Sequence, residues 1–285
     1  MFKNVLVGVD GRPNGRDAIA LASRLLDPTG KLTLAHVHSG QVHPLHAITP
    51  GLVAEEREAS QKLLAAELAA ADVDAGLVAV EDATPGAGLH RRAEEQGADL
   101  IVVGSCSRGV VGRVMLGDDT RGALNGAPCA VAIAARGCGE HPIPLAKVGV
   151  AYNGSDESKA ALAAARELAA PSRAEVLALE VVSIPAYAFT GLVAPAFGET
   201  VELMLSEGNA RMSELEGARG RAVYGLTGEE LAAFGDEVDL LVVGSRSYGP
   251  VRRLVVGSTS DHLQRHARCS LLVLPRAGAV GAGGA

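Results

Sequence analysis

Two short stretches of the chain combine serines with glycines at a fixed spacing, "VVGSCSRGVVGRVMLGDDT" and "VVGSRSYGPVRRLVVGSTS". Each has Gly-Ser-x-Ser directly after an apolar run and a second glycine at the same distance: Gly104 and Gly117 in one, Gly244 and Gly257 in the other. A glycine lets backbone come close to a ligand, and serine hydroxyls donate hydrogen bonds. A helix that starts after the second glycine would present unpaired N–H groups to an anion. The combination favours a phosphate held between two turns.

The alternative is that both stretches are ordinary strand-to-helix turns, with Ser258 or Asp118 as helix N-caps. Two copies in matching context favour the anion-binding interpretation. The chain has no G-x-x-x-x-G-K-[ST] pattern, and "GVDGRPNG" stands where a G-x-G-x-x-G would follow the first strand. The sequence therefore indicates neither P-loop hydrolysis nor a dinucleotide cofactor. No G-x-S-x-G elbow is present either, so we predict no catalytic residue.

The repetition extends well beyond the two loops. The segment "VGVDGRPNGRDAIALA" matches "VAYNGSDESKAALAAA", which aligns Asp10 with Asn153, and "ADLIVVGS" matches "VDLLVVGS". Duplication of one domain explains these matches better than chance. We expect domains at residues 1–137 and 147–276, a linker at 138–146 and a flexible tail at 277–285.

Within each half, short apolar runs rich in β-branched residues alternate with helical patterns. In the first half the expected strands are Asn4–Val9, Leu32–His38, Leu77–Val80, Leu100–Val103 and Cys129–Ala134. The expected helices are Arg16–Leu26 and Ala54–Ala71. The strand runs are apolar on both faces, which indicates parallel strands covered on both sides. The fold class is therefore α/β, with an open parallel sheet in each half.

Composition limits the possible functions. The chain has 285 residues, 48% of them hydrophobic, and a net charge of -7, so it carries no overall attraction to nucleic acid or to an anionic membrane. Its apolar runs are far shorter than the roughly 20 residues that cross a bilayer. The opening "FKNVLVGVD" lacks the pattern of a signal peptide. We expect a cytoplasmic protein that binds neither nucleic acid nor membrane.

Cysteines and histidines offer weaker candidates for chemistry. The cysteines form no C-x-x-C pair, and Cys129 and Cys269 occupy matching places where buried small hydrophobes are expected. Cys106 lies in the first loop without a visible partner thiol. Four histidines gather in "HVHSGQVHPLH": His36, His38, His43 and His46. On a strand the first two would point the same way, but no cysteine or carboxylate joins them at a familiar spacing, so we predict no metal site.

The motifs "VLVGVDG", "LAHVHS" and "ADLIVVGS", with the Gly-x-x-[Gly or Ser]-x9-Gly-Ser loop, resemble the universal stress protein family in tandem. The resemblance covers nearly the whole chain and implies two Rossmann-like domains of the adenine nucleotide alpha hydrolase type. Each would have a five-stranded parallel sheet, with domains paired through their last strands. In one branch of the family, ATP or another adenine nucleotide binds at this loop.

That resemblance implies binding residues in both halves. In the second half, Asn153 and Val181 would border the base, and ribose and phosphates would be surrounded by Gly244, Arg246, Ser247, Gly257, Ser258 and Thr259. The matching residues of the first half are Asp10, Val37, Gly104, Ser107, Gly117 and Asp118.

The chain also departs from the nucleotide-binding pattern. Ser107 and Ser247 stand where that branch has glycine, which adds side chains near the phosphates. In the first half, Asp118 replaces the serine or threonine after the last glycine, beside Asp119. Carboxylates repel a triphosphate unless Mg2+ bridges them. We therefore expect the second half, where Arg246, Arg252 and Arg253 flank the loop, to bind phosphate better.

The leading hypothesis is a nucleotide-responsive binding module in the stress response, whose repeats form an internal pseudo-dimer and which also forms a homodimer. One alternative is a structural or interaction protein of the same fold that holds no nucleotide. Another is a slow ATP hydrolase, which would be a weak ATPase at most.

Overall fold

The computed structural model describes residues 1–38, 50–105, 114, 118–140, 144–183, 194–245, 254 and 257–275. Its strands are β1 (Phe2–Gly8), β2 (Leu26–His38), β3 (Gly76–Glu81), β4 (Leu100–Gly104), β5 (Ala130–Ala134), β6 (Lys147–Ala151), β7 (Glu175–Val182), β8 (Arg219–Tyr224), β9 (Leu240–Gly244) and β10 (Ser270–Leu274). Its helices are α1 (Pro13–Leu25), α2 (Pro50–Ala71), α3 (Pro85–Gln96), α4 (Asp118–Leu124), α5 (Asp156–Ala169), α6 (Ala194–Ser213), α7 (Thr227–Phe234) and α8 (Ser258–His266).

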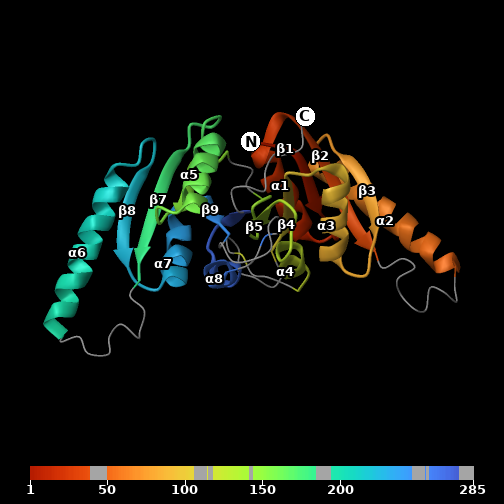
Figure 1. Ribbon diagram of the computed structural model, residues 1–285. Helices are drawn as coiled ribbons and strands as arrows, with labels where there is room; N and C mark the ends of the chain where they lie inside the picture. Colours follow the sequence, from red (N-terminus) through yellow and green to blue (C-terminus); the bar gives the residue numbers. More distant parts are fainter. Residues whose placement is uncertain are drawn as a thin grey trace, which may run out of the picture.

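All of these strands belong to one ten-stranded sheet, in the order β3-β2-β1-β4-β5-β10-β9-β6-β7-β8. Strands are parallel within each half, whereas β5 and β10 pair antiparallel, with Ala132 opposite Leu272. Figure 1 shows the sheet crossing the molecule, with α2 and α6 at its opposite ends. The α/β class, the five parallel strands per half and the pairing through the last strands are thus confirmed.

The apolar core continues through the β5–β10 junction on both faces of the sheet. On one face, Val131 and Leu271 belong to a core cluster to which α3, α4, α7 and α8 contribute. On the other, Ala132 and Leu272 belong to a cluster to which α1, α2 and α5 contribute. Successive residues of a strand point to opposite faces, so the apolar runs of these strands supply both clusters. The halves therefore share two continuous cores.

The predicted elements of the first half are present, with shifted ends. Helix α1 ends at Leu25, because Leu26 has an extended backbone and begins β2, where it pairs with Phe2 of β1. Helix α3 was not predicted. It begins after Thr84, whose hydroxyl accepts a hydrogen bond from Ala87 N at 3.3 Å, and it ends at Gly97 in the left-handed conformation.

A buried carboxylate fastens the connection between the halves to α1. Asp17 is only 4% exposed and accepts hydrogen bonds from Gly137 N at 2.9 Å and Gly139 N at 2.7 Å. Arg24, also on α1, donates to the carbonyl oxygen of Cys138 at 2.9 Å. The matching position in the second half is Ala160, so this anchor is specific to the first half. The chain leaving β5 is thereby held against α1.

Replacing Asp17 by Asn will lower the free energy of unfolding, by about 1–3 kcal/mol for a buried donor left without its acceptor. The amide keeps one acceptor oxygen but turns an N–H toward a backbone N–H. Urea unfolding followed by circular dichroism measures the loss. The matched control is Asp27→Asn, because Asp27 also accepts two hydrogen bonds, from Thr29, but at the surface. Equal losses in both variants would contradict the anchoring role of Asp17.

Candidate functional site

A cleft of about 310 Å³ opens at the carboxyl ends of β6, β7 and β9. The chain runs from β6 outward to β7 and returns to β9 on the other side of β6, so the cleft lies where the strand order reverses. The described residues that line it include five of the second-half residues that the resemblance implied: Asn153, Val181, Gly244, Gly257 and Thr259.

Of the implied residues outside this set, one is described in the second half and several lie outside the described residues. Ser258 is exposed and does not line it. Arg246, Ser247, Ser107 and Gly117 lie outside the described residues, as does the side chain of Asp118.

The implied first-half residues that the structure describes are spread over several elements. Gly104 ends β4, and Asp10 follows β1. Val37 is half-buried in β2 and packs on α3, where a Cβ at Gly88 would lie 2.8 Å from its side chain.

Gly104 and Gly244 are required by close protein packing. A Cβ at Gly244 would lie 2.8 Å from the Cβ of Glu157 and 3.0 Å from its carbonyl oxygen. A Cβ at Gly104 would lie 2.1 Å from the carbonyl oxygen of Asn14, the residue that matches Glu157. The sequence suggested that these glycines make room for a ligand, and the structure shows that they make room for the chain that begins α1 and α5.

Asp10 and Asn153 make the same local turn. The Oδ1 atom of Asp10 accepts a hydrogen bond from Arg12 N at 3.1 Å, and Oδ1 of Asn153 accepts one from Ser155 N at 3.1 Å. An amide oxygen serves this role as well as a carboxylate does. Ser155 then caps α5, because its hydroxyl accepts from Ser158 N at 3.2 Å. The change from Asp to Asn preserves the turn and removes a negative charge beside the cleft.

Helix α8 begins at the cleft. Its N-cap is Gly257, which makes no side-chain cap hydrogen bond, so the prediction of Ser258 as a possible N-cap is wrong. The first N–H groups of an α-helix have no partner within the helix and carry partial positive charge. Thr259 and the buried Ser260 add hydroxyl groups to the cleft wall. This end of the cleft suits an anion.

Sequence reasoning missed several cleft residues, because the fold brings them from elements that carry no motif. Leu179 in β7 and Leu231 in α7 supply apolar wall, and Tyr152 follows β6. Glu157 is the charged residue among the described lining residues. The sequence repeat aligns Glu157 with Asn14, and in the structure each of them lies against the glycine that ends a strand.

The two described histidines of the cluster point the same way, as their spacing predicted, and both face α2. Nδ1 of His36 lies 2.8 Å from the hydroxyl of Ser60, and Nδ1 of His38 lies 3.9 Å from Glu56. Burial, and then the neighbouring His38, lower the pKa of His36, which favours its neutral form. Among the described residues, no group of three or more His, Cys, Asp or Glu is arranged to hold a metal ion.

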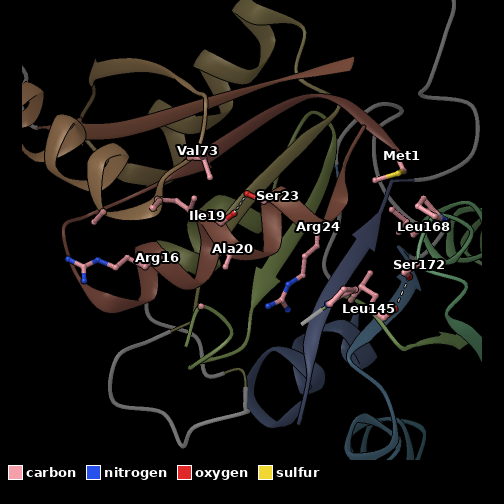
Figure 2. Close-up of a pocket in the computed structure, with 15 residues that line it drawn as sticks. Met1, Arg16, Ile19, Ala20, Ser23, Arg24, Val73, Leu145, Leu168 and Ser172 are labelled. Atoms are coloured by element: carbon pink, nitrogen blue, oxygen red, sulfur yellow. Dashed lines mark hydrogen bonds between the residues drawn. The ribbon is translucent and has the colours of Figure 1, made fainter. Parts of the chain in front are cut away.

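A second cavity, of about 540 Å³, lies between the repeats beside α1 and the end of α5. Its lining is mainly apolar, and in Figure 2 the side chain of Arg16 extends away from the other labelled residues. Nε of Arg16 lies 3.4 Å from the Glu67 carboxylate, and Arg24 donates to Cys138. Both arginines make polar contacts within the protein, and we interpret the cavity as a packing gap beside α1 and the end of α5.

The model of the universal stress protein family matches residues 1–135 and 145–275, one match for each half. This chain belongs to the universal stress protein family. A relative from Thermus aquaticus, described as a universal stress protein in QAH/OAS sulfhydrylase 3'region, is 30% identical over 134 residues, which cover 44% of this chain and 95% of that protein. That relative corresponds to a single repeat.

Two solved structures share the complete tandem arrangement. A universal stress protein from Archaeoglobus fulgidus DSM 4304 has a TM-score of 0.62 at 19% identity, covering 96% of this chain and 98% of that one. A putative universal stress protein from Pseudomonas aeruginosa UCBPP-PA14 has a TM-score of 0.57 at 16% identity, covering 96% and 93%. At these identities the likeness establishes the fold. Within the described residues, no helix combines the length and apolar character needed to cross a bilayer.

The thiols of Cys129 and Cys269 will resist alkylation in the folded protein. Burial raises the pKa of both from 9.0 to about 12, so at pH 8 almost no reactive thiolate is present. Iodoacetamide followed by mass spectrometry will find both unmodified without urea and modified in urea. Between pH 9 and 12 the unfolded state releases these protons first, so stability falls as pH rises. Equal labelling with and without urea would refute the assignment.

Proposed function

We propose that this protein binds an adenine nucleotide in the second-repeat cleft and acts as a stress-response binding module without enzymatic turnover. The observation that carries the proposal is the meeting of Asn153, Val181, Gly244 and Gly257 in one cleft at the reversal of strand order. The family resemblance implied a binding role for these residues, and the fold brings them together in the cleft from separate elements. Three further expectations remain predictions: domains at residues 1–137 and 147–276, a cytoplasmic location, and a homodimer.

The cleft offers different chemistry at its two ends. Leu179, Val181 and Leu231 are apolar and suit a purine base. The N-terminus of α8, with Gly257 and Thr259, suits the phosphates through backbone N–H groups and a hydroxyl. About 310 Å³ lies at the lower end of the range for small-molecule sites. We expect the described walls to enclose mainly the nucleoside, with the phosphates reaching toward α8.

Carboxylates shape the proposed preference for the second repeat. Asp118 opens α4 at the position where Ser258 opens α8, so a phosphate in the first repeat would meet a negative charge. In the second repeat, Glu157 lines the cleft. Carboxylate and phosphate oxygens are the ligands that Mg2+ prefers, so Glu157 is the described residue best suited to hold the ion beside a polyphosphate.

Replacing Gly257 by Asp will lower nucleotide affinity at least tenfold, because a carboxylate at the N-cap of α8 repels phosphate. Calorimetric titration with ATP in excess Mg2+ measures the affinity. Mass spectrometry of the denatured protein then identifies any nucleotide that was retained during purification. The matched control is Gly198→Asp, at a glycine of α6 where a new Cβ would contact nothing within 4 Å. That control should bind ATP as the unchanged protein does.

Two results would overturn the proposal. Protein that retains no nucleotide and gives no binding heat with ATP, ADP or AMP would support the interaction-only alternative, for which Ser107, Ser247 and Asp118 are the motivating residues. Phosphate release that is abolished by Gly257→Asp but unaffected by Gly198→Asp would instead show a slow ATP hydrolase.

A further inference from the structure

The repeats exchange backbone hydrogen bonds through two residues at matching places, Val114 and Leu254. Val114 N donates to the carbonyl oxygen of Ala267 at 2.9 Å, and Leu254 N donates to that of Ala127 at 2.9 Å. Gly126 N in turn donates to the carbonyl oxygen of Leu254 at 2.9 Å. We call these three hydrogen bonds the crossed contacts. Each joins a residue from the glycine-to-glycine stretch of one repeat to the turn before the last strand of the other.

The crossed contacts are enclosed in the shared core. Val114 is 1% exposed, Leu254, Ala127 and Ala267 are 0% exposed, and all four belong to the same core cluster. Protein interiors are close-packed and resist displacement of single groups. A movement of Leu254 therefore has to move the first-repeat residues that it contacts.

Helix α8 connects the cleft to these contacts at both of its ends. Its N-cap, Gly257, lines the cleft and lies three positions after Leu254 in the chain. Its C-cap, Ala267, donates to Leu263 O at 2.8 Å and accepts the hydrogen bond from Val114. A ligand held at the beginning of α8 thus acts on a helix whose end is bonded to the first repeat.

Helix α8 also carries an unsatisfied polar group. Gln264 is 0% exposed, and among the described residues neither atom of its side-chain amide has a hydrogen-bond partner. The matching residue of the first repeat is the buried Leu124, which needs none. Buried polar groups without partners destabilise the conformation that holds them. Of the two matching helices, α8 rather than α4 therefore carries this destabilising group, which a ligand held at its N-terminus would offset.

We infer that occupancy of the second-repeat cleft is communicated to the first repeat through α8 and the crossed contacts. This rests on the proposed nucleotide binding. A phosphate held at the start of α8 reduces local opening of the helix and of Leu254, and so reduces opening of the bond from Gly126. Since coupling free energies are reciprocal, a change that loosens the crossed contacts weakens nucleotide binding.

Hydrogen exchange with single-residue resolution tests the inference. Saturating ATP with Mg2+ is expected to slow exchange of the Gly126 amide about fivefold or more. The amide of Asp82, bonded to His38 O in the same repeat, serves as the internal control and should not change. The Gly257→Asp variant, measured in the same way, removes the second-repeat contribution, so a response that persists in it would come from nucleotide bound elsewhere and would overturn the inference.

A pair of core variants tests the reciprocal effect. Leu254→Ala should raise Gly126 exchange without ligand and weaken ATP binding about fivefold, although Leu254 does not line the cleft. Leu89→Ala, at a buried leucine of α3, should lower stability and leave ATP affinity unchanged. If ATP binds but the hydrogen-exchange rate of the Gly126 amide does not change, the coupling is overturned and the proposed function stands. If ATP does not bind at all, both fail together.

Discussion

The antiparallel pairing of β5 with β10 is the contact on which the rest of this structure depends. It converts two five-stranded parallel sheets into one of ten strands and protects the strand edge that each repeat would otherwise expose. Both core clusters pass through it, so burial of apolar surface stabilises the two repeats together. It also brings the turns at Ala127 and Ala267 within reach of Leu254 and Val114 from the opposite repeat. Duplication within one chain makes this pairing intramolecular.

A second constraint acts at the carboxyl ends of β4 and β9. The strands must end in glycine because the chain that starts α1 and α5 passes too close for a side chain, at Asn14 and Glu157. The same close passage forms one wall of the second-repeat cleft, since Glu157 and Gly244 both line it. The glycine spacing therefore serves packing first, and the space left between the strand ends and α8 is what a ligand can use.

Much of the fold was predictable because its signals are local. Apolar runs, the internal repeat and the loop motif identified the parallel strands and the start of α8. Helix α3 escaped prediction because its segment contains Pro85, Gly86 and Gly88, which lower helix propensity. The structure explains one of these glycines, since a Cβ at Gly86 would lie 2.5 Å from the backbone of Gly122 in α4. Helix–helix contacts of this kind have no signature in a single sequence.

The candidate site was predictable only in part, for the same reason. Asn153, Val181 and Gly257 were implied by the family resemblance, whereas Leu179 and Leu231 enter the cleft through strand order and helix packing. The crossed contacts were also invisible in the sequence, because they join backbone groups of residues far apart in the chain.

A crystal structure of the protein grown with ATP and Mg2+ tests the central claim most directly. The account predicts an adenine base against Val181 and phosphates at the N-terminus of α8 in the second repeat. Nucleotide bound in the first repeat alone, or in the cavity beside α1, would contradict it, as would an empty cleft at saturating ATP.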